Sequence, residues 1–84
     1  MTHWVYIYED ESSNLTIGIT ATMNMVTSKL KLKELIVYLR PFELPFDALA
    51  QKNLLGDISK ESLLYWIEKH KEATKKWLNV MGGR

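Results

Sequence analysis

Two short runs near the N-terminus alternate between two kinds of side chain. Residues 4–8 read WVYIY and residues 15–20 read LTIGIT. Aliphatic residues take every second position and aromatic, hydroxyl or glycine residues lie between them, which is the period of a β-strand. The aliphatic set is Val5, Ile7, Leu15, Ile17 and Ile19, and the other set is Trp4, Tyr6, Tyr8, Thr16, Gly18 and Thr20. Because the connection holds turn formers and no apolar residue, the pattern predicts a β-hairpin with one aliphatic face and one aromatic and hydroxyl face.

The next segments predict a helix and a third strand. Thr20 is a suitable capping residue for a helix over residues 21–29. Residues 34–40 read ELIVYLR, a strand that we expect to end before Pro41, because proline has no amide hydrogen for a ladder. Its apolar residues occupy both faces, so the strand is expected to be buried on both sides or central in the sheet.

The C-terminal half predicts two helices. Pro45 suits a first helical position and Gly56 a position just past the end, which predicts a helix from Pro45 to Leu55. Ala48, Leu49, Lys52 and Leu55 share one side of this helix, and we expect the apolar members of that side to pack on the sheet. Asp57 or Ser59 can cap a single long helix that ends near residue 79, where apolar residues recur at three- and four-residue steps. The expected fold class is α+β: a small three-stranded sheet, made of the N-terminal hairpin and the third strand, flanked by helices, with a long C-terminal helix.

Composition narrows the class of protein. The chain of 84 residues fits one domain spanning residues 1–84. Its 46% hydrophobic and 25% charged residues argue against disorder. The absence of cysteine excludes disulfides and thiolate metal sites. There is no basic leader and no apolar stretch near the ~18 residues that a bilayer crossing needs, so we expect a cytoplasmic protein without a membrane partner.

Charge is unevenly distributed along the chain. Residues 1–28 hold three acids and no Lys or Arg, so the remainder holds eleven bases against seven acids, net +4. This bias permits a nucleic-acid partner. The rings of Trp4, Tyr6 and Tyr8 are suited to stack on bases, but the acidic residues 9–11 beside them would repel a phosphate backbone. Packing inside the protein is therefore the favoured role of these rings.

The hairpin residues also carry a family resemblance. Trp4-Val5-Tyr6 followed by Thr16-Ile17-Gly18-Ile19-Thr20 resembles the paired signature of the GIY-YIG nuclease domain, and the order of elements continues the resemblance over residues 4–66. The first tyrosine of the family falls on Tyr6 and the glycine of the second triplet on Gly18, while Thr16 takes the place of the second tyrosine. The resemblance implies metal-dependent phosphodiester hydrolysis, in which a tyrosine pair activates water, an arginine steadies phosphate charge and a glutamate holds the divalent ion.

The remaining family positions depart from that chemistry. The place of the arginine is taken by Met25, and the nearby Lys29 is a point charge that does not reproduce a bidentate guanidinium. The place of the glutamate is taken by Lys52, whose ammonium group repels Mg²⁺. Tyr6 is thus the one catalytic position that keeps its residue type.

These departures predict a catalytically degenerate, GIY-YIG-like domain that binds protein or nucleic acid without a cofactor. Two alternatives stay open. One is a divergent Mg²⁺-dependent DNA endonuclease that uses Tyr6, Lys29 and another carboxylate. The other is an assembly protein that self-associates through its C-terminal helix, where Trp66 and Trp77 exceed what so small a core covers. Lys29, Trp66 and Trp77 are the candidate binding residues.

Overall fold

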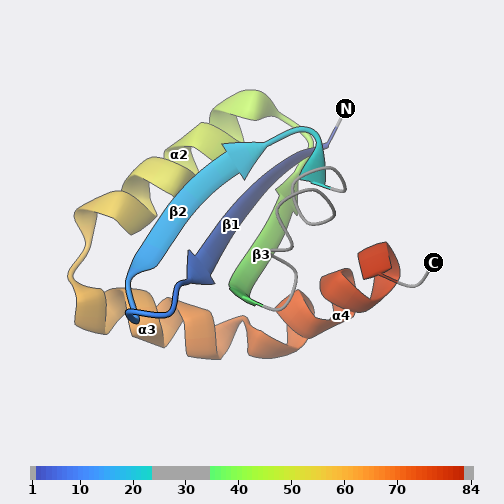
Figure 1. The fold of residues 1–84 in the computed structure, drawn as a ribbon. Helices are drawn as coiled ribbons and strands as arrows, with labels where there is room; N and C mark the ends of the chain where they lie inside the picture. The colour runs from blue at the N-terminus through green and yellow to red at the C-terminus, as the bar shows by residue number, and fades with distance from the viewer. Residues whose placement is uncertain (1, 24–34, 83–84) are drawn as a thin grey trace.

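The computed structural model describes residues 2–23 and 35–82 and has the expected α+β fold. Three antiparallel strands form one sheet in the order β2-β1-β3, with three described helices around it (Figure 1). The elements are β1 (His3–Glu9), β2 (Leu15–Thr20), β3 (Ile36–Phe42), α2 (Pro45–Asp57), α3 (Lys60–Lys69) and α4 (Lys71–Gly82). Most of the predicted helix over residues 21–29, with Met25 and Lys29, lies outside the described residues.

The predicted hairpin is confirmed, and a local hydrogen-bond network explains its turn. The Asp10 carboxylate accepts hydrogen bonds from the backbone amides of Ser12 and Asn14, each at 2.9 Å. Ser13 has a φ of 65°, in the left-handed region that short polar residues tolerate best after glycine. The turn chemistry therefore sets the register in which β1 and β2 pair.

The two faces of the sheet are covered by different helices. On the aliphatic face, α2 and α3 bury a core made of Val5, Ile7, Tyr38, Ala48, Leu55 and Leu63. On the aromatic face, α4 contributes to a second cluster made of Met23, Ile36, Leu39, Trp4, Tyr6, Tyr8, Trp77 and Leu78. Each fully buried aliphatic side chain contributes roughly 1.5–3 kcal/mol through the hydrophobic effect. The sheet thus separates two apolar layers of distinct composition.

β3 lies at an edge of the sheet. The sequence pattern allowed either a central strand or one buried on both sides, and it predicted that the strand ends before Pro41. The strand continues through Pro41 to Phe42. The backbone amide of Leu39 points away from β1, because it donates to the Thr74 hydroxyl at 3.1 Å. Pro41, two residues on, points the same way, so its missing amide hydrogen costs no bond to β1. Burial on both sides is correct, since Tyr38 and Leu39 face opposite sides and both are buried.

The boundary between α2 and α3 also differs from the prediction. Gly56 lies inside α2, which continues to Asp57, and it does not have the positive φ of a C-terminal glycine. The helix ends because Ile58 is extended, with φ of −87° and ψ of 164°. Ser59 then caps α3 as predicted, since its hydroxyl accepts a hydrogen bond from the Ser62 amide at 3.1 Å.

The predicted single helix over residues 59–79 is divided in two at His70. His70 has φ of −104° and ψ of 14°, outside helical geometry. Its ring stacks on Trp66 with centroids 5.3 Å apart and meets the edge of Tyr38 at 5.5 Å. This turn allows α3 to pack on the aliphatic face while α4 runs past β3 to the aromatic face (Figure 1).

Candidate functional site

Tyr6 and Gly18 lie opposite one another on the aromatic face, as the hairpin pattern predicts. They are partners in the register of β1 and β2. The Tyr6 ring covers Gly18 so closely that a Cβ atom at residue 18 would overlap the ring and its hydroxyl. Tyr6 also stacks beside Tyr8, with ring centroids 6.4 Å apart and planes 17° apart. A side chain at residue 18 would therefore displace the Tyr6 ring from its present position.

The environment of Tyr6 favours the neutral phenol. Burial raises the pKa of Tyr6 above its usual value of 10.0, and the neighbouring Tyr8 raises that pKa further. Both effects act against the phenolate, because an anion loses hydration when it is buried and is repelled by a second anion. A general base at neutral pH needs a pKa near 7. Tyr6 is therefore suited to packing and to donating a hydrogen bond rather than to accepting a proton.

The sheet separates the positions that the GIY-YIG resemblance brings together. Thr16 lies on β2 opposite Tyr8 and is exposed on the aromatic face. Lys52 lies on α2, which packs on the aliphatic face. The same helix carries Asp47 and Asp57. Within the described residues, no group of three His, Cys, Asp or Glu side chains is placed to hold a metal ion.

The two tryptophans of the C-terminal helices pack inward. Trp66 is half-buried against the aliphatic core. Trp77 is half-buried against the aromatic cluster and meets Trp4 edge-on, with centroids 5.4 Å apart and planes 78° apart. The strongly exposed apolar residues of α3 and α4 are instead Leu64, Tyr65 and Val80. Association through Trp66 and Trp77 stays a prediction.

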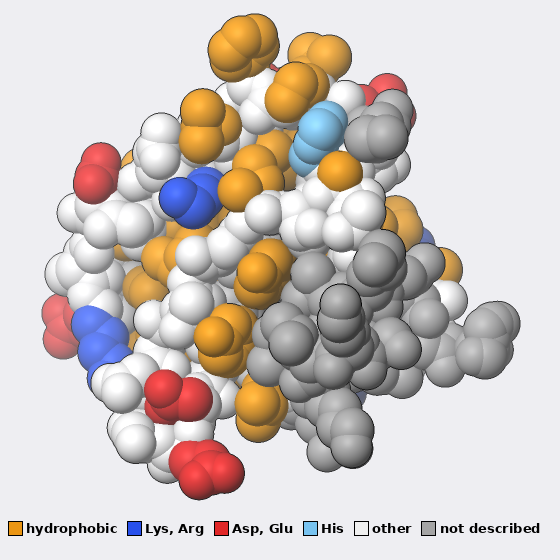
Figure 2. Space-filling view, turned by 45° about the horizontal axis from the view of Figure 1, so that its top comes forward, with side chains coloured by type: hydrophobic (Ala, Val, Ile, Leu, Met, Phe, Trp, Pro, Cys, Tyr) orange, Lys and Arg blue, Asp and Glu red, His pale blue; other side chains and the backbone are white. Residues whose placement is uncertain are grey.

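α2 is apolar on both of its sides. Ala48 and Leu55 are buried against the sheet as predicted, whereas Leu49, which we expect on the same side, is 45% exposed. We call the exposed apolar side chains at its start and on its outer side the α2 face: Leu44 (60% exposed), Phe46 (82%), Leu49 and Leu54. Figure 2 shows hydrophobic side chains gathered over the start of α2. The sequence interpretation missed this surface, although the run LPFDALAQKNLL over residues 44–55 already has apolar residues all around a helix.

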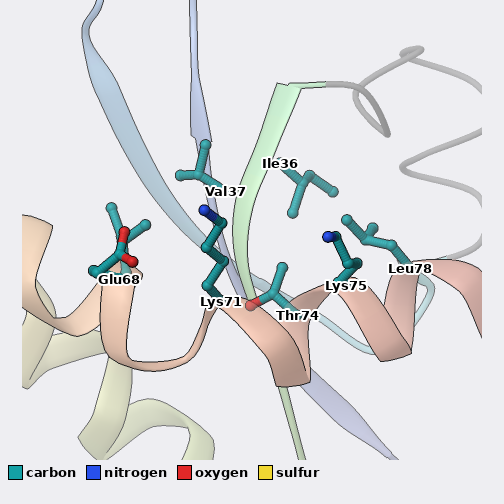
Figure 3. Close-up of a pocket in the computed structure, with 8 residues that line it drawn as sticks. Ile36, Val37, Glu68, Lys71, Thr74, Lys75 and Leu78 are labelled. Atoms are coloured by element: carbon teal, nitrogen blue, oxygen red, sulfur yellow. The ribbon is translucent and has the colours of Figure 1, made fainter.

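A cleft of about 310 Å³ lies between β3 and the junction of α3 with α4. Its lining is Ile36, Val37, Ile67, Glu68, Lys71, Thr74, Lys75 and Leu78. Figure 3 shows Lys71 and Lys75 rising from α4 on either side of Thr74 toward β3. The Thr74 hydroxyl is already bonded to the Leu39 amide. The cleft therefore has apolar walls with charged side chains around them. The Thr74 hydroxyl in its lining is engaged in a hydrogen bond that holds α4 to β3.

Comparison with known proteins gives no relative. No family model, no curated protein and no solved structure matches this chain. Among the helices that the structure describes, none has the length and hydropathy that a bilayer crossing requires.

Proposed function

We propose that the protein is a non-catalytic binding domain whose partner is another protein that docks on the α2 face. The observation that carries this proposal is the double-sided apolar character of α2. A helix that is hydrophobic all round normally buries all of its sides. Here Ala48 and Leu55 are buried on the sheet, whereas Phe46 is 82% exposed. The outer side of α2 therefore has the composition of a surface that a partner covers.

The chemistry of the α2 face favours a protein over a nucleic acid. Phe46 is an aromatic side chain of the kind that anchors protein interfaces, and the exposed side chains of Leu44, Leu49 and Leu54 add aliphatic surface before it and along α2. Residues 43–57, which include α2, hold three acids, Glu43, Asp47 and Asp57, against one base, Lys52. Nucleic-acid binding depends on Lys and Arg contacts to phosphates. The partner we propose accordingly presents an apolar groove or patch.

The GIY-YIG resemblance is compatible with this proposal if it reflects the origin of the fold and not its activity. The close approach of Tyr6 to Gly18 supports it, because both residues match the family signature. In the sequence, Lys52 and Thr16 take the positions at which the resemblance implies catalytic groups. We therefore propose that the domain has a nuclease-like scaffold without the nuclease activity.

The experiment compares Phe46→Ser with Val80→Ser. Val80 is a matched control, since it is an exposed apolar residue (64%) on α4, away from the α2 face. Both substitutions are at exposed positions and should change the free energy of unfolding by no more than about 0.5 kcal/mol. Proteins captured from the native host by the wild-type chain are identified, purified and titrated against each variant by calorimetry.

We expect Phe46→Ser to raise the Kd of the purified partner at least about tenfold, which corresponds to roughly 1.4 kcal/mol. Val80→Ser should leave that Kd unchanged. Equal weakening by both substitutions, or no change with Phe46→Ser, would contradict docking on the α2 face.

A further inference from the structure

The outer edge of β2 exposes unpaired backbone groups. The amide of Asp10 donates to the carbonyl of Asn14 at 3.0 Å, which makes these two residues a hydrogen-bonded pair. Bonded and non-bonded pairs alternate along an antiparallel ladder. The backbone groups of Leu15, Ile17 and Ile19 therefore point away from β1, and we call them the β2 edge. Within the described part of the chain, no residue hydrogen-bonds to the β2 edge.

The opposite edge of the sheet, on β3, is protected against pairing with another strand, whereas the β2 edge is not. On β3, Thr74 accepts a hydrogen bond from the outward amide of Leu39, and Pro41 offers no amide hydrogen. β2 reads LTIGIT and contains no charge and no proline, the residues that commonly block edge-to-edge pairing. Its β-branched threonines and isoleucines favour strand geometry. The sequence and the structure thus leave one edge of the sheet able to accept another strand.

The β2 edge is self-complementary about Ile17. A two-fold axis at this residue pairs Ile17 with Ile17 of a second copy and Leu15 with Ile19 of that copy. Every residue in these pairs has an outward-facing backbone, so the register forms about six hydrogen bonds. The same register places Thr16 opposite Gly18 of the second copy. Aliphatic side chains therefore continue on one face across the axis, and Thr16 and Gly18 continue on the other.

A groove beside the β2 edge leaves room for the second strand's aliphatic side chains. It has a volume of about 310 Å³ and is lined by Asn14, Leu15, Ile17, Leu55, Gly56, Ile58, Lys60 and Leu63. A Cβ atom added at Gly56 would meet nothing within 4 Å, so the wall formed by α2 is open here. At 100° per residue, Leu49 and Lys52 lie on the same side of α2 as Gly56. Lys52 has a long aliphatic stem that can carry its charge to solvent.

We propose that two copies of this chain associate through their β2 edges in antiparallel register about Ile17, forming one continuous sheet across the dimer. The net charge of +1 per chain opposes this association only weakly. The interface is centred on the β2 edge and does not include Phe46, the aromatic residue of the α2 face, so either proposal can fail without the other. It also differs from association through the C-terminal helices.

Amide hydrogen exchange and sedimentation velocity on the wild-type chain test the proposal together. As the protein passes from monomer to dimer with concentration, exchange at Leu15, Ile17 and Ile19 should slow by more than about tenfold. The amides of Thr16 and Gly18 point toward β1 and serve as internal controls that are protected at every concentration. An isotope-filtered NOE between the α-protons of Thr16 and Gly18 from different copies fixes the register.

Two variants separate the interface from other modes of association. Ile17→Pro removes one outward amide that the monomer does not use, and it should shift the dimer dissociation constant upward by at least about tenfold. Ile17→Val and Phe46→Ser should dimerise like the wild type. A chain that stays monomeric at millimolar concentration overturns the proposal, as does a dimer whose Leu15, Ile17 and Ile19 amides exchange freely. The exchange measurement on the wild type decides the matter even when Ile17→Pro fails to fold.

Discussion

Tyr6 is held as a neutral phenol by its place on the sheet, and its titration can be measured. Burial, and then the neighbouring Tyr8, raise the pKa of Tyr6 above 10.0. We expect an absorbance titration at 295 nm to show a tyrosine transition above pH 10 that is missing in Tyr6→Phe. A variant whose titration curve keeps that transition would assign it to another tyrosine.

The same raised pKa predicts the pH dependence of stability. Below pH 10 Tyr6 is protonated in both the folded and the unfolded chain, so the contribution of the neutral phenol to the free energy of unfolding is fully present. As the pH rises above 10 the unfolded chain loses this proton first, and the free energy of unfolding falls through the folded pKa. Urea unfolding at pH 9 and pH 11 should show a smaller loss in Tyr6→Phe than in the wild type. An equal loss in both would remove Tyr6 as a cause.

At the scale of single residues, the sequence predicts some contacts well and others poorly. The approach of Tyr6 to Gly18 follows from a period of two and a short turn, both of which are local. The exposure of Leu49 and Phe46 does not follow. α2 has apolar residues on both sides, and the prediction that Leu49 packs on the sheet with Ala48 and Leu55 is wrong, so the sequence alone does not fix which apolar residues meet the sheet. That choice depends on the shape of the core around Ala48 and Leu55.

Among the elements, α4 is joined to β3 by a buried hydrogen bond as well as by apolar packing. Thr74 is 4% exposed, and its oxygen accepts a hydrogen bond from the Leu39 amide at 3.1 Å. Thr74→Val keeps the side-chain shape but leaves that amide unsatisfied, so we expect a loss of about 1–3 kcal/mol in the free energy of unfolding. Thr74→Ser retains the hydroxyl and is the control. Urea unfolding of the three proteins checks this, and a valine variant no less stable than the serine variant would contradict it.

Element types were predictable from local patterns, whereas their ends depended on tertiary contacts. Pro41 fits within β3 because the strand lies at an edge of the sheet. The position of a strand in its sheet cannot be read from the sequence of that strand alone. Gly56 lies inside α2 because Ile58, and not a glycine, ends that helix. His70 interrupts the C-terminal helix where its ring meets Trp66 and Tyr38, and the apolar period continues through that residue without a break.

At the scale of the whole molecule, the sheet divides the chain into two chemical sides. The aromatic face holds Tyr6 and Thr16, and the aliphatic face is covered by the helix that carries Lys52. The sequence resemblance assigned all three residues to positions of one catalytic site. Matching residues by their order in a sequence does not show which face of a sheet a later helix covers. Among the described residues, the α2 face and the β2 edge are the surfaces for which we propose partners, and neither proposal depends on Tyr6, Thr16 or Lys52.

This division leads to the prediction that the chain does not cleave DNA with Mg²⁺ or Mn²⁺. Metal-assisted hydrolysis needs a carboxylate-bound ion beside the group that activates water. The carboxylates of α2, Asp47 and Asp57, are on a helix that packs on the face opposite Tyr6, and Lys52 carries the wrong charge for a cation. We expect no metal-dependent nicking of supercoiled plasmid and no heat on calorimetric titration with Mn²⁺.

Lys52→Glu sharpens this prediction because it introduces the residue type that the GIY-YIG resemblance implies at this position. We expect the variant to remain inactive, since the new carboxylate would lie on a helix separated from Tyr6 by the sheet, and Thr16 would still replace the second tyrosine. Losing several cooperating groups costs many powers of ten in rate, so a single restoration recovers little. Metal-dependent nicking by the wild-type chain that disappears in Tyr6→Phe would overturn this reasoning and identify a divergent nuclease.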